Sequence, residues 1–238
     1  MSDMSAPPAQ AEIVFPPLDL DRPVAEQIFE AIKTAILTTA LPPGCLISEA
    51  EIGARFGASR TPVREAFTQL RDDGLIITRP SRGNYVSKLS EQRIREAQFV
   101  REALETANVA RLCETGLPGA IHEEIEEVLT QQARHAKEGD DLGFQRTDDQ
   151  FHALLARATG FGRAETLLNR EKAALDRLRV FALTERHHSD RLLGEHRAIL
   201  EAILAGDAAA ADSVLRAHLR SVLALLSGMI AAHRDHFE

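Results

Sequence analysis

The sequence predicts a mainly α-helical protein, in which three helices and a two-stranded ribbon are joined to an all-α antiparallel bundle of six helices. Apolar residues recur every three or four positions over most of the 238 residues, as in amphipathic helices. Short β-branched segments typical of strands occur only between residues 75 and 87, and the pattern is helical from Ser90 onward. With 44% hydrophobic residues, a chain of this length favours two domains, which we place at residues 18–88 and 89–238.

The first two helices are marked by their ends. Residues 1–17 contain four prolines and no periodic apolar pattern, so we expect a disordered arm. Pro23 opens a helix to about Thr39, with an isoleucine or valine every fourth residue from Val24. Ser48 and Glu51 form a capping box for a short second helix, which ends at Gly57.

The third helix and the ribbon follow directly. Thr61 is a good N-cap and Pro62 fits the first helical position, so a helix is expected from Pro62 to about Asp72. Strands at 75–79 and 84–87 flank a turn at 80–83. Three helices followed by a two-stranded ribbon is the order of a winged helix-turn-helix.

Glycine- and proline-containing breaks divide the remaining chain into six helices. We expect these at about 90–115, 119–138, 141–159, 162–185, 188–205 and 207–233.

The charge is unevenly distributed. The chain carries a net charge of -8 with a pI near 5.6, which excludes a protein that is basic overall. Residues 55–88 nevertheless hold seven Lys or Arg against three acids, a local excess of four positive charges. Such a local excess is typical of a nucleic-acid footprint.

Other composition signals are weak. Cys45 and Cys113 are far apart and lack zinc-type spacing, so we expect no disulfide framework. The acidic, Pro- and Ala-rich N-terminus lacks the order of a signal peptide, and no apolar run reaches a membrane span. We therefore expect a cytoplasmic protein without a membrane partner.

Two arginines stand at the start of the third helix. Arg60 and Arg64 place positive charge at a helix end that already favours anions, which fits contact with phosphates and guanine edges. On this hypothesis both read base edges, Ser59 and Thr61 donate to phosphate, and Gly83 lets the wing approach the minor groove. The predicted backbone-positioning cations are Arg55, Arg79 and Arg82. The alternative is that these arginines are merely solvated and that Thr61-Pro62 is only a helix cap.

The chain resembles the GntR family of bacterial transcription regulators. The residues that carry the resemblance are Pro43-Gly44, Leu46, Ser48-Glu49, Ser59-Arg60-Thr61-Pro62-Val63-Arg64-Glu65-Ala66, Leu70, Asp73-Gly74-Leu75 and Arg82-Gly83-Asn84-Tyr85-Val86. The second half resembles the FCD effector domain of the FadR-type branch, in its VanR-like variety with six helices. Its marks are Arg101-x-x-Leu104-Glu105, Asp148-x-x-Phe151-His152, His196-Arg197-Ala198-Ile199-Leu200 and Ala217-His218-Leu219.

Four residues are candidate metal ligands. Asp148 and His152 stand four apart and share a helix face, while His196 and His218 lie among apolar residues of two other helices. Three imidazoles and a carboxylate suit Zn²⁺, our first expectation, and also Ni²⁺ or Mn²⁺. The family resemblance implies the same four positions. Asp149 is the rival carboxylate.

A second signal concerns an anionic effector. Arg101 and Asn108 occupy positions of an otherwise apolar helix face, and a buried guanidinium requires an anion. That anion is either Glu105, in a structural ion pair, or a bound effector carboxylate. The resemblance implies sensing of small organic acids, which favours the second alternative. Six other histidines receive no role: His122, His135, His187, His188, His233 and His236.

The sequence thus predicts a ligand-responsive regulator rather than an enzyme. A hydrolytic metal site is disfavoured because no general base accompanies it, Glu195 being expected to point elsewhere. A metal sensor, in which the cation is the signal, remains an alternative. We expect a homodimer on a pseudo-palindromic operator, with repression relieved by an acid and a joint at Ser87–Glu91.

Overall fold

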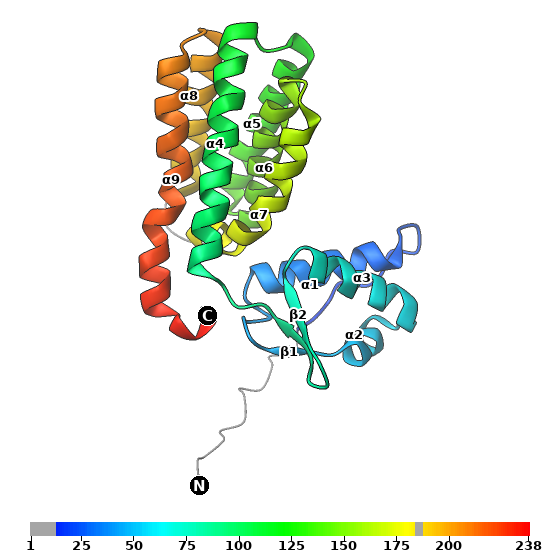
Figure 1. The fold of residues 1–238 in the computed structure, drawn as a ribbon. Coiled ribbons are helices and arrows are strands. Elements are labelled where there is room, and N and C mark those ends of the chain that lie inside the picture. The colour runs from blue at the N-terminus through cyan, green and yellow to red at the C-terminus, as the bar shows by residue number, and fades with distance from the viewer. Residues whose placement is uncertain (1–12, 184–187) are drawn as a thin grey trace. The chain divides into compact units, whose positions relative to one another are not determined.

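The computed structural model of the chain describes residues 13–183 and 188–238 (Figure 1). The chain divides into two compact units, residues 1–88 and 89–238. Each unit has its own apolar core. The prediction of a winged helix-turn-helix followed by an all-helical bundle is confirmed.

The first unit contains three helices at the expected positions: α1 (Val24–Leu37), α2 (Glu49–Phe56) and α3 (Arg60–Asp72). The isoleucines of α1 and the apolar face of α3 are fully buried against one another. Ser48 accepts a hydrogen bond from the Glu51 N–H at 3.4 Å, and Gly57 ends α2 in the left-handed conformation (φ 62°). The predicted cap and stop of α2 are therefore confirmed.

The start of α3 differs from the prediction. The helix begins at Arg60, so Ser59 rather than Thr61 is the N-cap residue. Pro62 is the third helical residue, where its missing N–H is still one of the four that a helix leaves free. Both Arg60 and Arg64 consequently belong to the first two turns of α3.

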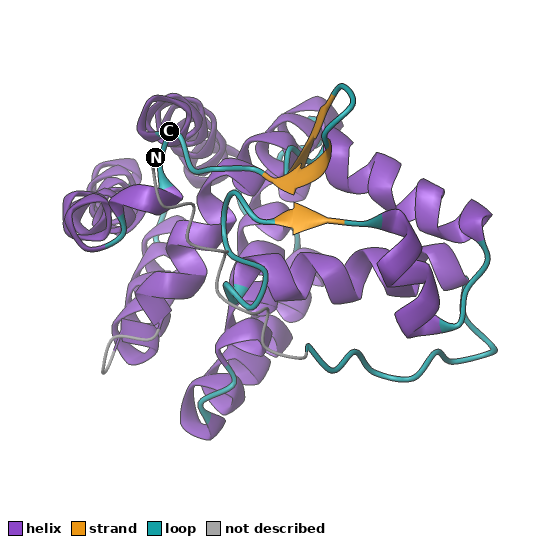
Figure 2. Cartoon of the chain, turned by 90° about the horizontal axis from the view of Figure 1, so that it is seen from below, coloured by secondary structure: helices purple, strands orange, loops and turns teal. Residues whose placement is uncertain are grey.

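The sheet has one strand more than predicted. The strands β2 (Ile76–Arg79) and β3 (Gly83–Val86) form the expected hairpin, with Ile76 opposite Val86 and Arg79 opposite Gly83. The two-residue strand β1 (Leu46–Ile47) pairs antiparallel with β3, giving the order β1-β3-β2. Figure 2 shows these strands in orange among the helices.

Residues 13–17 were expected to belong to a disordered arm, and this expectation is wrong for them. The Phe15 ring lies 4.8 Å from the Phe56 ring, centroid to centroid, and Ile13 packs against the core of the first unit. The Ile13 carbonyl also accepts a hydrogen bond from Arg55 at 3.4 Å. Two apolar side chains suffice to anchor this short segment. Residues 1–12 lie outside the described part of the chain.

The second unit is the expected bundle. Its helices are α4 (Glu91–Thr115), α5 (Gly119–Glu138), α6 (Asp141–Ala158), α7 (Gly162–Leu183), α8 (His188–Leu204) and α9 (Ala208–Ala232), followed by a 3₁₀ turn, η1 (Arg234–His236). Asp140 and Asp207 cap α6 and α9 by accepting hydrogen bonds from the N–H groups of Gly143 and Ala210. Polar breaks with good N-caps thus set the helix boundaries.

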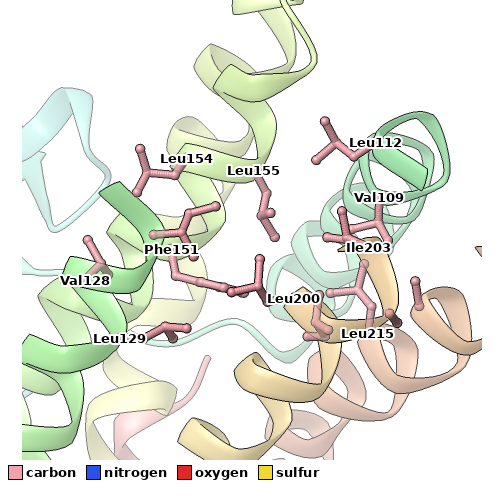
Figure 3. Packing of buried hydrophobic residues seen from close by; sticks show 14 of the residues in the cluster. Val109, Leu112, Val128, Leu129, Phe151, Leu154, Leu155, Leu200, Ile203 and Leu215 are labelled. Carbon is pink, nitrogen blue, oxygen red and sulfur yellow. The ribbon is translucent and has the colours of Figure 1, made fainter. Parts of the chain in front are cut away.

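The main core of the bundle lies between α4, α5, α6, α8 and α9. Figure 3 shows how side chains from these helices interdigitate, among them Phe151, Leu155, Leu200 and Leu215. A second cluster joins Leu89, Leu175, Leu178, Val222 and Phe237. Leu89 and Phe237 also form a parallel β-bridge that the sequence analysis missed.

Helix α9 is more apolar than the sequence analysis recognised. By length and composition it could span a membrane, with a mean hydropathy of 1.4 over its most apolar stretch. Its buried residues nevertheless contribute to both clusters of the bundle, as Leu219 and Leu226 do. Its apolar character therefore has an explanation in packing.

Candidate metal centre and nucleic-acid interface

The four predicted metal ligands meet inside the bundle. Asp148, His152, His196 and His218 come from α6, α8 and α9, and each is buried. Each offers one ligand atom, and these atoms all lie within 4.8 Å of one another. His152 Nε2 is 3.2 Å from His218 Nε2, and His196 Nε2 is 3.3 Å from Asp148 Oδ1.

The opposite nitrogen of each imidazole faces an acceptor on the protein. Nδ1 of His196 lies 2.8 Å from Gln132 Oε1 on α5, and Nδ1 of His218 lies 2.9 Å from Glu195 Oε2 on α8. Nδ1 of His152 lies 2.6 Å from Glu105 Oε2 on α4, an ion-pair contact without hydrogen-bond geometry. A proton on each Nδ1 leaves the Nε2 lone pairs directed at the shared space, as metal-bound histidines require.

Burial also favours the neutral, metal-binding form of His196 and His218. It lowers the pKa of His196 well below its ordinary value, and the neighbouring His152 and Arg101 lower it further. Burial likewise lowers the pKa of His218, assisted by His196 and His152. Imidazoles that resist protonation keep their lone pairs available to a cation.

The donor set fits a divalent cation. Ligand atoms 3.2 and 3.3 Å apart match two ligands on one ion with bonds of about 2.0–2.2 Å. Nε2 of His196, although buried, makes no hydrogen bond within the described residues, so it is available as a ligand. Asp149, the rival carboxylate, instead pairs with Lys172 and Arg179 and stands outside the group.

A small cavity adjoins this group. Its volume is about 30 Å³, and it is lined by residues of α4, α6, α7, α8 and α9, namely Arg101, Gln145, Asp148, Arg179, His188, Leu192, His218, Leu219, Ser221 and Val222. Polar groups therefore converge beside the metal ligands. Asn108, predicted to bind effector, is not among the lining residues, and its buried Nδ2 has no hydrogen-bond partner within the described chain.

Arg101 makes the ion pair that was one of its two predicted alternatives. Its Nε contacts Glu105 Oε1, and both side chains are buried. Burial opposes ionisation of Glu105, but the charges of Arg101 and His152 outweigh it and hold the pKa of that carboxyl well below its ordinary value. Since Arg101 also lines the cavity, the pair links the metal group to the predicted effector space.

Three residues near the site were missed or misplaced by the sequence analysis. Glu195 does not point elsewhere but contacts His218, and His188, given no role, lines the cavity. Arg179, which the sequence did not single out, is buried and pairs with Asp148. An arginine within a predicted helix gives no signal that it faces inward. His187 lies outside the described residues.

The predicted DNA-contacting residues are all exposed on the first unit. Ser59, Arg60, Thr61 and Arg64 occupy the N-terminal end of α3. Arg64 Nε lies 3.6 Å from Glu49 Oε2, and its side chain is 73% exposed, so the guanidinium is accessible to another anion. The geometry brings these four side chains together at one helix end.

The wing carries two of the remaining predicted cations, Arg79 and Arg82, and α2 carries the third, Arg55. Arg79 lies over the Tyr85 ring at 4.9 Å, and the Tyr85 hydroxyl donates to the Arg82 carbonyl at 3.1 Å. Gly83 has a φ of 101°, and an added Cβ would lie 3.0 Å from Leu46 Cδ1, so the turn requires glycine here. Arg55 differs from the others because it is held by the Ile13 carbonyl.

Two protein families match the chain. The family described as "Bacterial regulatory proteins, gntR family" matches residues 24–86, and the FCD domain matches residues 96–221. The first match includes α3 and the wing. The second includes all four candidate metal ligands.

Known proteins resemble the chain over most of its length. It is 35% identical over 207 residues to the "HTH-type transcriptional repressor RspR" of Escherichia coli, covering 86% of this chain and 90% of that protein. It is 31% identical to the "Probable D-xylose utilization operon transcriptional repressor" of Paenarthrobacter nicotinovorans, covering 84% and 87%. A solved GntR transcriptional regulator from Rhodococcus sp. RHA1 is 26% identical, with a TM-score of 0.69 over 86% of this chain and 97% of that one.

Proposed function

Because the chain belongs to the GntR family of bacterial transcription regulators, we propose that it is a cytoplasmic repressor whose affinity for a pseudo-palindromic operator is controlled by a small organic acid at a divalent-metal site. It acts as a homodimer, since two-fold symmetry doubles the base contacts of one reading head. Repression is favoured because two of the relatives are named as transcriptional repressors.

The first unit supports the DNA-binding half of this proposal. Arg60 and Arg64 are exposed at the N-terminal end of α3, and Arg79 and Arg82 lie at the wing turn. In a helix-turn-helix the second of the two helices enters the major groove, where arginine pairs with guanine. Arg60 and Arg64 therefore read bases, whereas Ser59, Thr61 and the wing arginines contact the DNA backbone. Gly83, which has no side chain, lets the wing approach the minor groove closely.

The observation that carries the regulatory half is how the two ring nitrogens of each of the three histidines are placed. Their Nε2 atoms converge with Asp148. Nδ1 of His196 and of His218 has a hydrogen-bond acceptor on another helix, and Nδ1 of His152 lies beside the Glu105 carboxylate. A core that needed only satisfied imidazoles would not have to leave three lone pairs facing one carboxylate. Asp148, His152, His196 and His218 would hold Zn²⁺ first, or Ni²⁺ or Mn²⁺, and the ion would supply positive charge to bind an acid.

The test compares three forms of the full chain on an operator-containing DNA fragment. Metal-free, zinc-loaded and zinc-plus-acid protein are titrated, with acetate, lactate and succinate as probe acids. An acid-dependent loss of affinity that requires zinc supports the proposal. A loss with zinc alone favours the metal-sensor alternative, and zinc-loaded protein that responds to neither overturns regulation at this site.

A further inference from the structure

Arg179 of α7 contacts the carboxylate of the candidate metal group. Its Nη2 pairs with Asp148 Oδ2, and its Nη1 lies 2.9 Å from Asp149 Oδ1. With its amide in the orientation that satisfies its hydrogen bonds, Gln145 accepts from both terminal nitrogens at 2.9 and 3.1 Å. A guanidinium therefore neutralises the carboxylate that completes the candidate metal group.

This guanidinium depends on its carboxylates. Burial lowers the pKa of Arg179 well below its ordinary value, and neighbouring Arg101 lowers it further. A desolvated cation deprived of its anion is strongly destabilising. If Asp148 turned to a metal ion, Arg179 would lose one of its two close carboxylates and keep Asp149, so a further anion would compensate for the loss.

The charge balance around the site also favours the binding of an anion together with a metal ion. The described ion pairs join four carboxylates (Glu105, Asp148, Asp149 and Asp176) to three cations (Arg101, Lys172 and Arg179). These seven groups together carry a net charge of minus one. A divalent cation changes that charge to plus one, so the carboxylate of a bound acid would offset the excess positive charge.

The space beside Arg179 is too small for an effector in this conformation. A cavity of about 30 Å³ has room for only about two water molecules. Arg179 lines this cavity next to Asp148. Movement of its side chain away from Asp148 would both enlarge the space and present two N–H donors to it.

We propose that Arg179 is an internal counter-cation, which holds Asp148 in the metal-free protein and binds the effector carboxylate once Asp148 serves as a metal ligand. This inference rests on the proposed metal site and adds a coupling to it. Metal and acid must then bind with positive cooperativity, because the acid stabilises the displaced guanidinium. Arg179 positions the ligand Asp148 in one state and contacts the acid in the other.

The test measures zinc affinity of the full chain by competition with a chromophoric chelator, with and without succinate. Wild type should bind zinc more tightly in succinate, by a factor in the range of about 5–150 that is typical of coupled sites. R179Q should bind zinc more tightly than wild type without succinate, since a competing cation is gone, and should lose the succinate effect. R179K, which retains the charge, should keep part of it.

The matched control is R170Q, which removes an exposed arginine from the same helix and should behave as wild type. Circular dichroism of the metal-free variants verifies folding, and R179K provides the comparison if R179Q unfolds. This inference alone would be overturned if R179Q kept wild-type zinc affinity and the full succinate effect. If R179Q unfolds, the same outcome for R179K would overturn it. Failure of wild type and R170Q to bind zinc would overturn the metal site as well.

Discussion

Arg64 presents its guanidinium to solvent at the start of α3, where its contact with Glu49 is loose at 3.6 Å. We expect Arg64→Ala to abolish specific operator binding, because loss of a bidentate guanine contact costs about 1–3 kcal/mol per half-site. The fold should be unchanged because the side chain is mostly exposed. Footprinting of the full chain measures the effect.

Lys33→Ala is the control for Arg64→Ala, since it removes one positive charge from α1 of the same unit, where Lys33 pairs with Asp73. It should leave the footprint intact. If Arg64→Ala reduced only the salt dependence and kept the sequence preference, Arg64 would be a phosphate contact instead.

Glu195 supports the metal group through His218. Glu195→Ala removes the acceptor of Nδ1, so the imidazole loses its fixed tautomer and orientation. Zinc affinity, measured by chelator competition, should fall about 10- to 100-fold. Glu201→Ala, an exposed change on the same helix, should have no effect. Equal zinc affinities for the two variants would contradict a supporting role for Glu195.

Among the site residues, the sequence indicated those with a periodic signature and missed those defined by tertiary contacts. Asp148 and His152 share a helix face, and His196 and His218 lie among apolar neighbours, so their inward direction could be expected. Glu195 and Arg179 are long side chains whose direction depends on α9 and α6 respectively. No spacing rule on their own helices encodes those partners.

Asp140 determines where α6 begins. Its side chain accepts from the Gly143 N–H at 2.9 Å, and this hydrogen bond, together with His135 and Arg146, lowers the pKa of the carboxyl. Asp140→Ala should lower the unfolding free energy by about 1 kcal/mol, the usual effect of losing an N-cap. Urea unfolding at neutral pH measures this loss.

The pH dependence separates the charge of Asp140 from its capping geometry. Because its folded pKa lies below the ordinary 3.8, its charge stabilises the fold above that pH, and this contribution is lost as the pH falls through the folded value. Asp140→Asn keeps a cap but should show less of this acid loss than wild type. Identical acid profiles for the two proteins would contradict the charge contribution.

Among the elements, long amphipathic helices were predictable and very short strands were not. Within the described residues the bundle helices match their expected ranges to within two residues at each end, because periodicity and capping residues agree there. The expected end of the fourth bundle helix, at residue 185, lies outside the described residues. Strand β1 is two residues long, too short for alternation to appear. Its pairing with β3 depends on contacts nearly 40 residues away along the chain.

The molecule consists of two units with separate cores, and among the described residues the candidate metal group lies in the second unit. Zinc should therefore raise the unfolding free energy of residues 89–238 and leave that of residues 1–88 unchanged. At free zinc of 100 times its Kd the gain would be about 2.7 kcal/mol.

Calorimetry of the full chain with and without a chelator measures this difference. One transition should move and the other should stay. His196→Ala, which removes a ligand, should make the moving transition insensitive to zinc. A uniform shift of both transitions would show that the metal ion acts on more than the helical unit.

The bridge between Leu89 and Phe237 joins the two ends of the second unit. The Leu89 N–H donates to the His236 carbonyl at 2.9 Å, and the Glu238 N–H donates to the Leu89 carbonyl at 3.0 Å. Neighbouring ends are the condition under which a domain tolerates circular permutation. We expect the helical unit to keep its bundle when a short peptide joins these ends and new termini are opened between α6 and α7.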